Sequence, residues 1–157
     1  VKKGVTVSLS QDSTTANNSL DMFRSMYLLS IHKDAKMDPT IFPPEKALEM
    51  ATTDGAKTLL WEHKIGSLEP SKKADIILVD TRRSNWVPMH DFSIVPNLVY
   101  SGDGADVDTV IIDGNVVMEN RQIKTMHEHS ILEKAQRTSE GILKRADVRI
   151  HPRWRVE

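Results

Sequence analysis

The first part of the chain carries a strand pattern that is followed by a helix pattern. Residues 5–13 begin as an apolar run of the kind that forms a buried strand, and they end in a polar loop. Residues 22–31 place apolar side chains three and four positions apart, which predicts a helix with one apolar face that ends near residues 33–38. Ser19 is placed to cap this helix, with Asp21 in its first turn. We therefore expect a strand, a loop and an amphipathic helix in that order.

Prolines and a glycine mark the limits of the next helical stretch. Pro43-Pro44 opens a second helix, because proline is tolerated in the first turn, with apolar residues such as Ala47 and Ala51 inside it. Asp54-Gly55 predicts a break in this helix or a close approach of the backbone. Residues 56–61 then resume as a short helical piece.

From Ile65 the pattern changes to that of a small β unit. Residues 74–80 form an apolar, β-branched run that predicts a largely buried strand. Residues 81–96 form a looser stretch, in which Pro88 and Pro96 argue against a central strand.

The last third of the chain combines a hairpin pattern with a helix pattern. Residues 107–112 and 116–119 are β-branched runs on either side of Asp113-Gly114-Asn115, and Asp-Gly between such runs is a strong hairpin signal. Residues 130–145 predict an amphipathic helix, and residues 149–157 form a basic tail. Strand, helices, β unit and helix therefore follow one another, which indicates an α/β chain.

Charge and composition exclude several classes of protein. The 157 residues include 21 Lys and Arg against 22 Asp and Glu, with no basic stripe of the kind that binds nucleic acid. The absence of cysteine excludes disulfides and thiolate metal sites, and it fits a reducing compartment. No apolar run reaches the roughly 18 residues of a membrane span, and the first residues lack the apolar region of a signal peptide. A cytoplasmic protein is expected.

Asp12 is the residue placed most like a catalytic group. It lies where the strand of residues 5–13 opens into the loop before a helix, and α/β barrels place catalytic side chains at such strand ends. The alternative is that Asp12 is a turn or capping residue, which loop statistics favour. Asn17 and Asn18, which follow in the loop, are interpreted as Asx-turn or capping residues.

His127-Glu128-His129 comes nearest to a metal-binding motif. Two imidazoles can bind one metal, but this spacing is not that of the His-Glu-x-x-His zinc helix, and no third ligand stands at a recognisable distance. A solvated helix start is therefore favoured. Ser13 lacks the Gly-x-Ser-x-Gly context of a nucleophile, and Gly102-Asp103-Gly104 does not continue as a phosphate-binding loop.

Residues 4–13, with Asn17-Asn18 and Leu20-Asp21-Met22-Phe23, resemble the eighth barrel strand and its loop in the metal-dependent amidohydrolase superfamily. The resemblance is to the branch that holds methylthioadenosine/S-adenosylhomocysteine deaminases and the triazine and chlorotriazine hydrolases. It continues in the same order to about Asn120, through residues 47–52, 55–56, 65–69, 73–80, 88–91, 98–101 and 107–118.

This resemblance implies a fold and a division into domains. The fold is α/β: the final strand and helices of a TIM-like (β/α)8 barrel, followed by part of a small β-sandwich and a C-terminal helix. Residues 1–62 would be the last barrel strand and the helices after it. Residues 63–125 would be part of a composite β-sandwich domain, and residues 126–157 the C-terminal helix and tail.

The resemblance also implies a chemistry. Enzymes of this branch hydrolyse C–N or related bonds on a purine-like or triazine-like ring, with water activated by one divalent metal, zinc or iron. The carboxylate that matches Asp12 is both a metal ligand and a proton acceptor. One departure lies beside it, because the family usually has Gly-Thr-Asp where this chain has Ser10-Gln11-Asp12. Gln11 adds bulk there, which bears on the range of substrates.

The other metal ligands of the family belong to the first two-thirds of its chain, outside this sequence. Since the sequence begins with Val1 rather than Met, we expect the C-terminal part of a longer enzyme, inactive alone and without a stably bound metal. Exposed sheet edges and apolar helix faces predict a homo-oligomer, or a partner chain that supplies the rest. The alternative is a non-catalytic assembly or interaction module, in which Asp12 is a turn residue.

Overall fold

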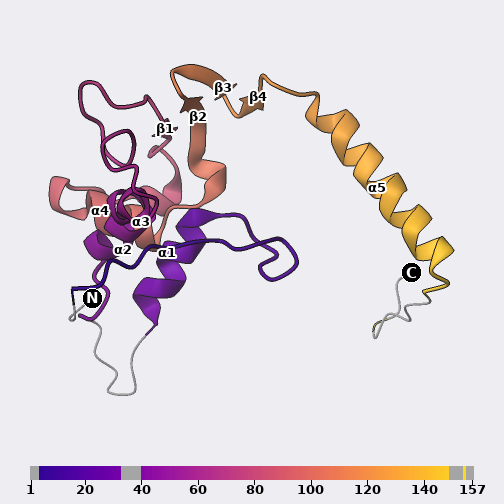
Figure 1. The fold of residues 1–157 in the computed structure, drawn as a ribbon, viewed down its shortest axis with the longest axis horizontal. Coiled ribbons are helices and arrows are strands. Elements are labelled where there is room, and N and C mark those ends of the chain that lie inside the picture. The colour runs from indigo at the N-terminus through magenta and orange to yellow at the C-terminus, as the bar shows by residue number, and fades with distance from the viewer. Residues whose placement is uncertain (1–3, 33–39, 149–153, 155–157) are drawn as a thin grey trace. The chain divides into compact units, whose positions relative to one another are not determined.

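The computed structural model describes residues 4–32, 40–148 and 154 (Figure 1). Contacts between residues divide the chain into two compact units, one that extends to Gln122 and one that begins at Ile123. The first unit contains short helices and a sheet, and the second contains one long helix. None of the helices in the described ranges is long and apolar enough to cross a membrane.

The first helix, α1, covers Met22–Ile31 as the spacing predicts, and it ends shortly before the expected residues 33–38. Its N-cap is Asp21 rather than Ser19, which corrects the sequence prediction. The Phe23 amide donates to Asp21 Oδ1 at 2.9 Å, while Ser19 Oγ accepts from the Asp21 amide at 3.3 Å. The other Asp21 oxygen accepts from the Gly104 amide at 3.0 Å. Asp21 therefore joins the start of α1 to a loop 83 residues later, a contact with no local signal in the sequence.

Two short helices follow, α2 at Pro44–Ala51 and α3 at Thr53–Thr58. The predicted break at Asp54-Gly55 was wrong, because the helical backbone is interrupted at Thr52, where φ is −126° and ψ is −90°. Asp54 instead lies inside α3, buried to 9% exposure of its side chain. Its carboxylate forms ion pairs with Lys46 Nζ at 2.6 Å and with Lys57 Nζ at 3.3 Å. These two ion pairs offset the cost of burying the Asp54 carboxylate inside the helix.

We expect Asp54 to make the stability of the first unit depend on pH. Hydrogen bonding to Lys46 holds the pKa of Asp54 below its ordinary value of 3.8. A carboxyl whose pKa is lower in the folded state stabilises the fold above 3.8, and this contribution is lost as the pH falls through the folded-state pKa. Asp54→Asn should therefore cost about 1–2 kcal/mol at pH 7, and the difference from wild type should shrink between pH 5 and pH 2.

Urea denaturation at a series of pH values measures this difference. Glu49→Gln is the matched control, because Glu49 also pairs with Lys46 at 2.9 Å but its side chain is 57% exposed. Its effect should stay within about 0.5 kcal/mol. A difference between Asp54→Asn and wild type that does not change with pH would contradict the prediction.

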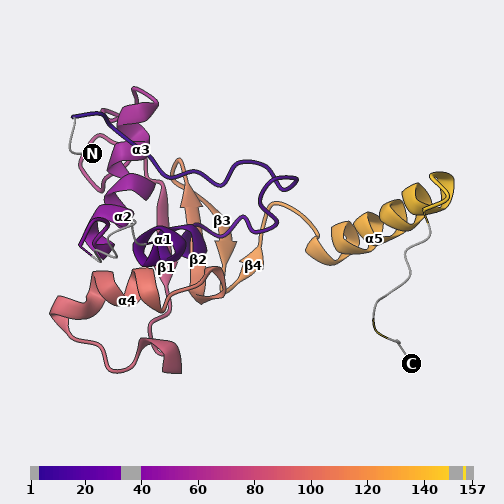
Figure 2. The ribbon, with the colours of Figure 1, turned by 90° about the horizontal axis from the view of Figure 1, so that it is seen from below.

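Four strands form one sheet in the order β1-β2-β3-β4 (Figure 2). They are β1 Ile76–Val79, β2 Val107–Ile112, β3 Asn115–Glu119 and β4 Gln122–Ile123. β2 pairs antiparallel with both β1 and β3. The predicted hairpin is confirmed, with φ of 50° at Asp113 and 79° at Gly114 between the paired residues Ile112 and Asn115. Positive φ at both central residues matches the twist of the flanking strands.

Residues 5–13 form no strand in the structure, which corrects the sequence prediction. A strand needs a neighbour to complete its hydrogen bonds, and within the described part of the chain the sheet consists of β1 to β4. The Leu9 amide instead donates to the Met50 carbonyl of α2 at 2.9 Å. The Leu9 side chain packs against the core, whereas Val5 and Val7 are exposed to 64% and 42%. The apolar run therefore forms neither a strand nor a buried face.

The stretch between β1 and β2 contains a helix that the sequence did not predict. It consists of the 3-10 turns η1 Ser84–Trp86 and η2 Asp91–Ser93, then α4 Ile94–Tyr100 and the 3-10 turn η3 Gly104–Asp106. Pro96 lies in the first turn of α4. A proline there costs no internal hydrogen bond, so the residue that argues against a strand is compatible with a helix start.

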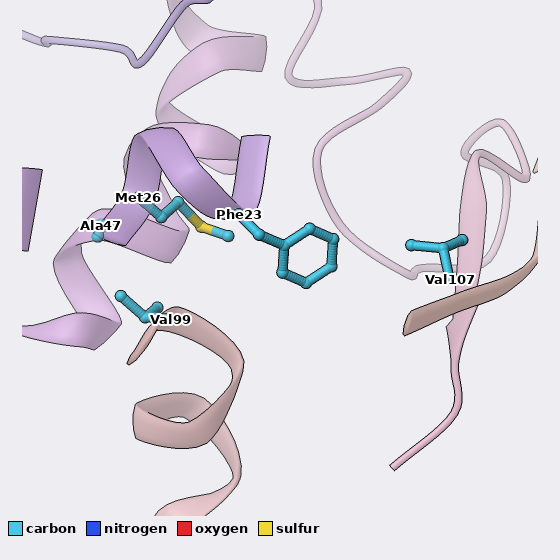
Figure 3. Packing of buried hydrophobic residues seen from close by; sticks show 5 residues of the cluster. All are labelled: Phe23, Met26, Ala47, Val99 and Val107. Atoms are coloured by element: carbon cyan, nitrogen blue, oxygen red, sulfur yellow. The ribbon is translucent and has the colours of Figure 1, made fainter. Parts of the chain in front are cut away.

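The core of the first unit lies where three helices meet the sheet. Its buried members are Phe23 and Met26 from α1, Ala47 from α2, Val99 from α4 and Val107 from β2. Figure 3 shows the Phe23 ring between the helical residues and Val107. Each large side chain buried in this way contributes about 1.5–3 kcal/mol. The core therefore fixes α1, and with it the loop that precedes α1, against the sheet.

Asp106 is completely buried at the end of η3. Its carboxylate accepts four hydrogen bonds, from Arg83 Nη1 at 2.6 Å, Asn85 Nδ2 and Trp86 Nε1 at 2.9 Å, and the Asp103 amide at 3.1 Å. Burial alone would raise the pKa of Asp106, but these hydrogen bonds and the Arg83 charge lower the pKa below its ordinary value. The carboxylate thus holds η1 and the loop before β2 together.

The second unit contains α5, Glu128–Arg145, which confirms the helix predicted over residues 130–145. Its last turn carries Lys144 and Arg145, whose charges favour the C-terminal end of a helix. No residue of α5 is buried. On its surface, Arg137 Nη2 forms an ion pair with Glu133 Oε2 at 2.9 Å, four residues away.

Candidate functional site

Asp12 lies in a turn with left-handed backbone, and its φ is +57°. The Asp12 amide donates to Ser10 Oγ at 3.3 Å, and the Ser13 amide donates to Asp12 Oδ1 at 2.7 Å. The side chain is exposed. Aspartate tolerates this conformation because its carboxylate can bond to nearby amides. The geometry presents an exposed carboxylate, one oxygen of which is bonded to the Ser13 amide.

The loop after Asp12 is held by short-range hydrogen bonds. The Ser13 carbonyl accepts from the amides of Ala16 and Asn17 at 3.0 and 2.8 Å. Asn17 Oδ1 accepts from the Ser19 amide at 3.2 Å, which confirms the predicted Asx turn for Asn17. Asn18 is exposed beside it, and its capping role stays a prediction.

Gln11 is directed toward α1. Its Nε2 donates to Ser25 Oγ at 3.1 Å and lies 3.9 Å from Met22 Sδ. The bulk that the sequence places beside Asp12 is therefore packed against a helix. Ser25 was missed at the sequence level, because a contact between residues 14 positions apart leaves no local pattern.

The residues present do not by themselves fit a divalent metal. In residues 4–32 and 40–148, no three His, Cys, Asp or Glu side chains are gathered closely enough to bind one. Catalytic zinc sites use three protein ligands, whereas Asp12 is a single carboxylate. His127 is the N-cap of α5, and His129 Nε2 lies 3.2 Å from Glu133 Oε1 with the His129 side chain 89% exposed. The predicted helix start at residues 127–129 is confirmed.

Known proteins with similar sequences and structures include two deaminases and a chlorohydrolase. A 5-methylthioadenosine/S-adenosylhomocysteine deaminase of Acetivibrio thermocellus is 42% identical over 145 residues, which are 92% of this chain and 33% of that protein. An adenosine deaminase from Xanthomonas campestris, solved with bound zinc, has a TM-score of 0.85 and 27% identity, and the match covers 91% of this chain and 32% of that chain. The zinc complex of an atrazine chlorohydrolase from Arthrobacter aurescens has a TM-score of 0.74 and 22% identity, with 87% and 30% covered.

These similarities agree with the resemblance that the sequence motifs carry. The chain spans about a third of the length of the curated relatives it matches. The predicted correspondence to the C-terminal part of an enzyme in the deaminase and triazine hydrolase branch is confirmed. The mixed α/β architecture is confirmed as well. Residues 1–117 match the model of the amidohydrolase family, and the chain belongs to that family.

Proposed function

We propose that this chain is part of an enzyme that hydrolyses a C–N bond on a purine-like ring and releases the amine. The observation that carries the proposal is the 42% identity to a methylthioadenosine/S-adenosylhomocysteine deaminase over 92% of the chain. The triazine-like alternative is supported less, since the chlorohydrolase shares 22% identity. A non-catalytic assembly module remains the competing function, in which Asp12 acts only as a turn residue.

We propose Asp12 as the residue of this chain that takes part in the reaction. An exposed carboxylate can accept a proton from water and return it to a departing amine. Asp12 is also the residue here that would contribute a ligand to a divalent metal, and zinc is the metal bound in the two similar solved structures. The remaining ligands would have to come from outside this chain, so we propose that the isolated chain is inactive.

The architecture that we propose for the complete enzyme accounts for the unpaired segment at residues 5–13. Residues 1–62 would be the last strand and helices of a (β/α)8 barrel, so this segment would pair with neighbouring barrel strands. Residues 63–125 would be part of a β-sandwich, and residues 126–157 the C-terminal helix and tail. The high TM-score to the adenosine deaminase supports this assignment. The unpaired edges also favour association, either as a homo-oligomer or with the remaining portion of the enzyme.

A chimera tests the proposed reaction. This chain would replace the corresponding third of the Acetivibrio thermocellus relative, and the release of ammonia from adenosine-type substrates would be measured with zinc present, with triazines in a parallel arm. We expect turnover by the chimera and none by the isolated chain. Turnover by the isolated chain would contradict its proposed inactivity, and a folded but inactive chimera would favour the assembly module.

Asp12→Asn in this chimera should lower kcat at least about 100-fold, because a proton acceptor would be lost. Asp113→Asn is the matched control. Asp113 is also an exposed aspartate with positive φ, 50° against 57° for Asp12, but it lies in the β2–β3 turn. Activity in Asp12→Asn equal to that of the Asp113 control would show that Asp12 is not catalytic.

A further inference from the structure

Gln11 and Asp12 are neighbours in sequence but differ in their surroundings. The Asp12 side chain is exposed, whereas Gln11 is partly buried against α1. The two α1 residues that Gln11 meets, Met22 and Ser25, lie three positions apart and so share one face of the helix. Gln11 therefore connects the turn that carries Asp12 to a helix that the core holds in place.

The bond between Gln11 and Ser25 does not depend on which way the amide is turned. A serine hydroxyl both donates and accepts, so it can bond to either end of the amide group. The other amide atom, Oε1, is buried, and no residue in the described ranges bonds to it. Because a buried amide without partners is costly, the bond to Ser25 anchors the side chain in this position.

The backbone at Asp12 has a φ of +57°, which aspartate adopts at reduced cost through local bonds such as that from the Ser13 amide to Asp12 Oδ1 at 2.7 Å. Attachments of the neighbouring residues add to this local support. The segment before the turn is joined to α2 through the Leu9 amide and the Met50 carbonyl at 2.9 Å. Gln11 adds a second attachment, to α1, directly before the turn.

We propose that Gln11 is a positioning residue for Asp12: its hydrogen bond to Ser25 holds the left-handed turn and thereby fixes the direction of the Asp12 carboxylate. The effect on catalysis rests on the proposed function, whereas the effect on the turn does not. The effect of Gln11 on the range of substrates stays a prediction, and its contacts with α1 support a role beside it, in holding the neighbouring residue.

NMR spectroscopy of the 157-residue chain tests the effect on the turn. The cross-peak between the amide and Hα protons of Asp12 is strong while φ is positive, because the two protons are then close. Gln11→Met keeps the length of the side chain and removes the bond, and Ser25→Ala removes it from the helix side. Each should weaken the cross-peak at least about twofold, and the double variant no further, because both remove one shared interaction.

Gln136→Met is the matched control, since it removes a glutamine whose Nε2 donates to Glu140 Oε1 at 2.7 Å on α5. It should leave the Asp12 cross-peak unchanged. Ser25→Ala keeps the test valid if Gln11→Met fails to fold, because alanine favours the helix. A cross-peak that stays at wild-type strength in folded Ser25→Ala overturns the proposal.

The chimera provides a second readout. There Gln11→Met should lower kcat about tenfold with KM little changed, since a misdirected proton acceptor affects the chemical step rather than substrate binding. A rise in KM alone would overturn the positioning role and favour a contact with substrate. An inactive chimera would count against the proposed reaction, while the NMR measurement would still decide whether Gln11 holds the turn.

Discussion

Asp106→Ala should lower the free energy of unfolding of the first unit by about 3–5 kcal/mol, because a fully buried carboxylate that accepts four hydrogen bonds is removed, although the Arg83 side chain is itself 48% exposed. The Arg83 guanidinium would lose its carboxylate at 2.6 Å. The Trp86 indole N–H, which is buried and donates at 2.9 Å, would have no acceptor. Each buried donor left in this way costs about 1–3 kcal/mol. Asn85 and the Asp103 amide would lose the same acceptor.

Urea denaturation followed by circular dichroism measures this loss, because the signal does not depend on Trp86, which is 1% exposed and contacts Asp106 directly. Asp108→Ala is the control, because its side chain is 32% exposed and Arg121 Nη1 lies 3.4 Å away. It should cost less than about 1 kcal/mol. Trp86→Phe removes one donor and keeps the aromatic ring, so an intermediate loss of about 1–2 kcal/mol is expected. Equal stability of the Asp106 and Asp108 variants would contradict the network.

Local patterns predicted the elements whose cause is local. The β2–β3 hairpin follows from Asp113-Gly114, because few other residue pairs adopt positive φ at both positions. α1 and α5 follow from apolar spacing over 10 and 18 residues. The predictions that were wrong rest on patterns that are compatible with two different structures. An apolar run such as residues 5–13 becomes a strand only beside another strand, and a proline such as Pro96 can end one element or begin another.

Some features of the candidate site are likewise predictable from the sequence, and others are not. The position of Asp12 after an apolar run and before a helix is visible in the sequence, and so is the Asx turn at Asn17. The contact of Gln11 with Ser25 and the contacts of Asp106 with Arg83, Asn85 and Trp86 are not visible, because they join residues 14 and 20 to 23 positions apart. Such contacts are set by how α1, α4 and the sheet pack, which no local spacing encodes. The other metal ligands that the family resemblance implies would lie outside the chain, so the spacing of His127 and His129 could not indicate them.

Gly66→Ala should destabilise the first unit by about 2–5 kcal/mol, since it combines left-handed backbone with steric overlap. The φ of Gly66 is +94°. A Cβ added there would lie 2.7 Å from the Ala56 Cβ and 3.3 Å from the Thr52 carbonyl oxygen. Thr52 lies at the junction of α2 and α3, and Ala56 lies inside α3. Because Ala56 is buried and has no flexible side chain, it cannot move aside. The close approach that the sequence suggested at Gly55 therefore occurs at Gly66.

Alanine substitutions at two other glycines distinguish the backbone cost from the steric overlap. Gly114 has a φ of +79° with nothing within 4 Å of an added Cβ, so Gly114→Ala should show the backbone cost alone, about 1–2 kcal/mol. Gly55 lies inside α3 with open space, where the nearest atom is the Met50 carbonyl oxygen at 3.8 Å. Gly55→Ala should therefore stabilise the helix by about 0.5–1 kcal/mol. If Gly66→Ala cost no more than Gly114→Ala in urea denaturation, the packing of Gly66 against Ala56 would not limit stability.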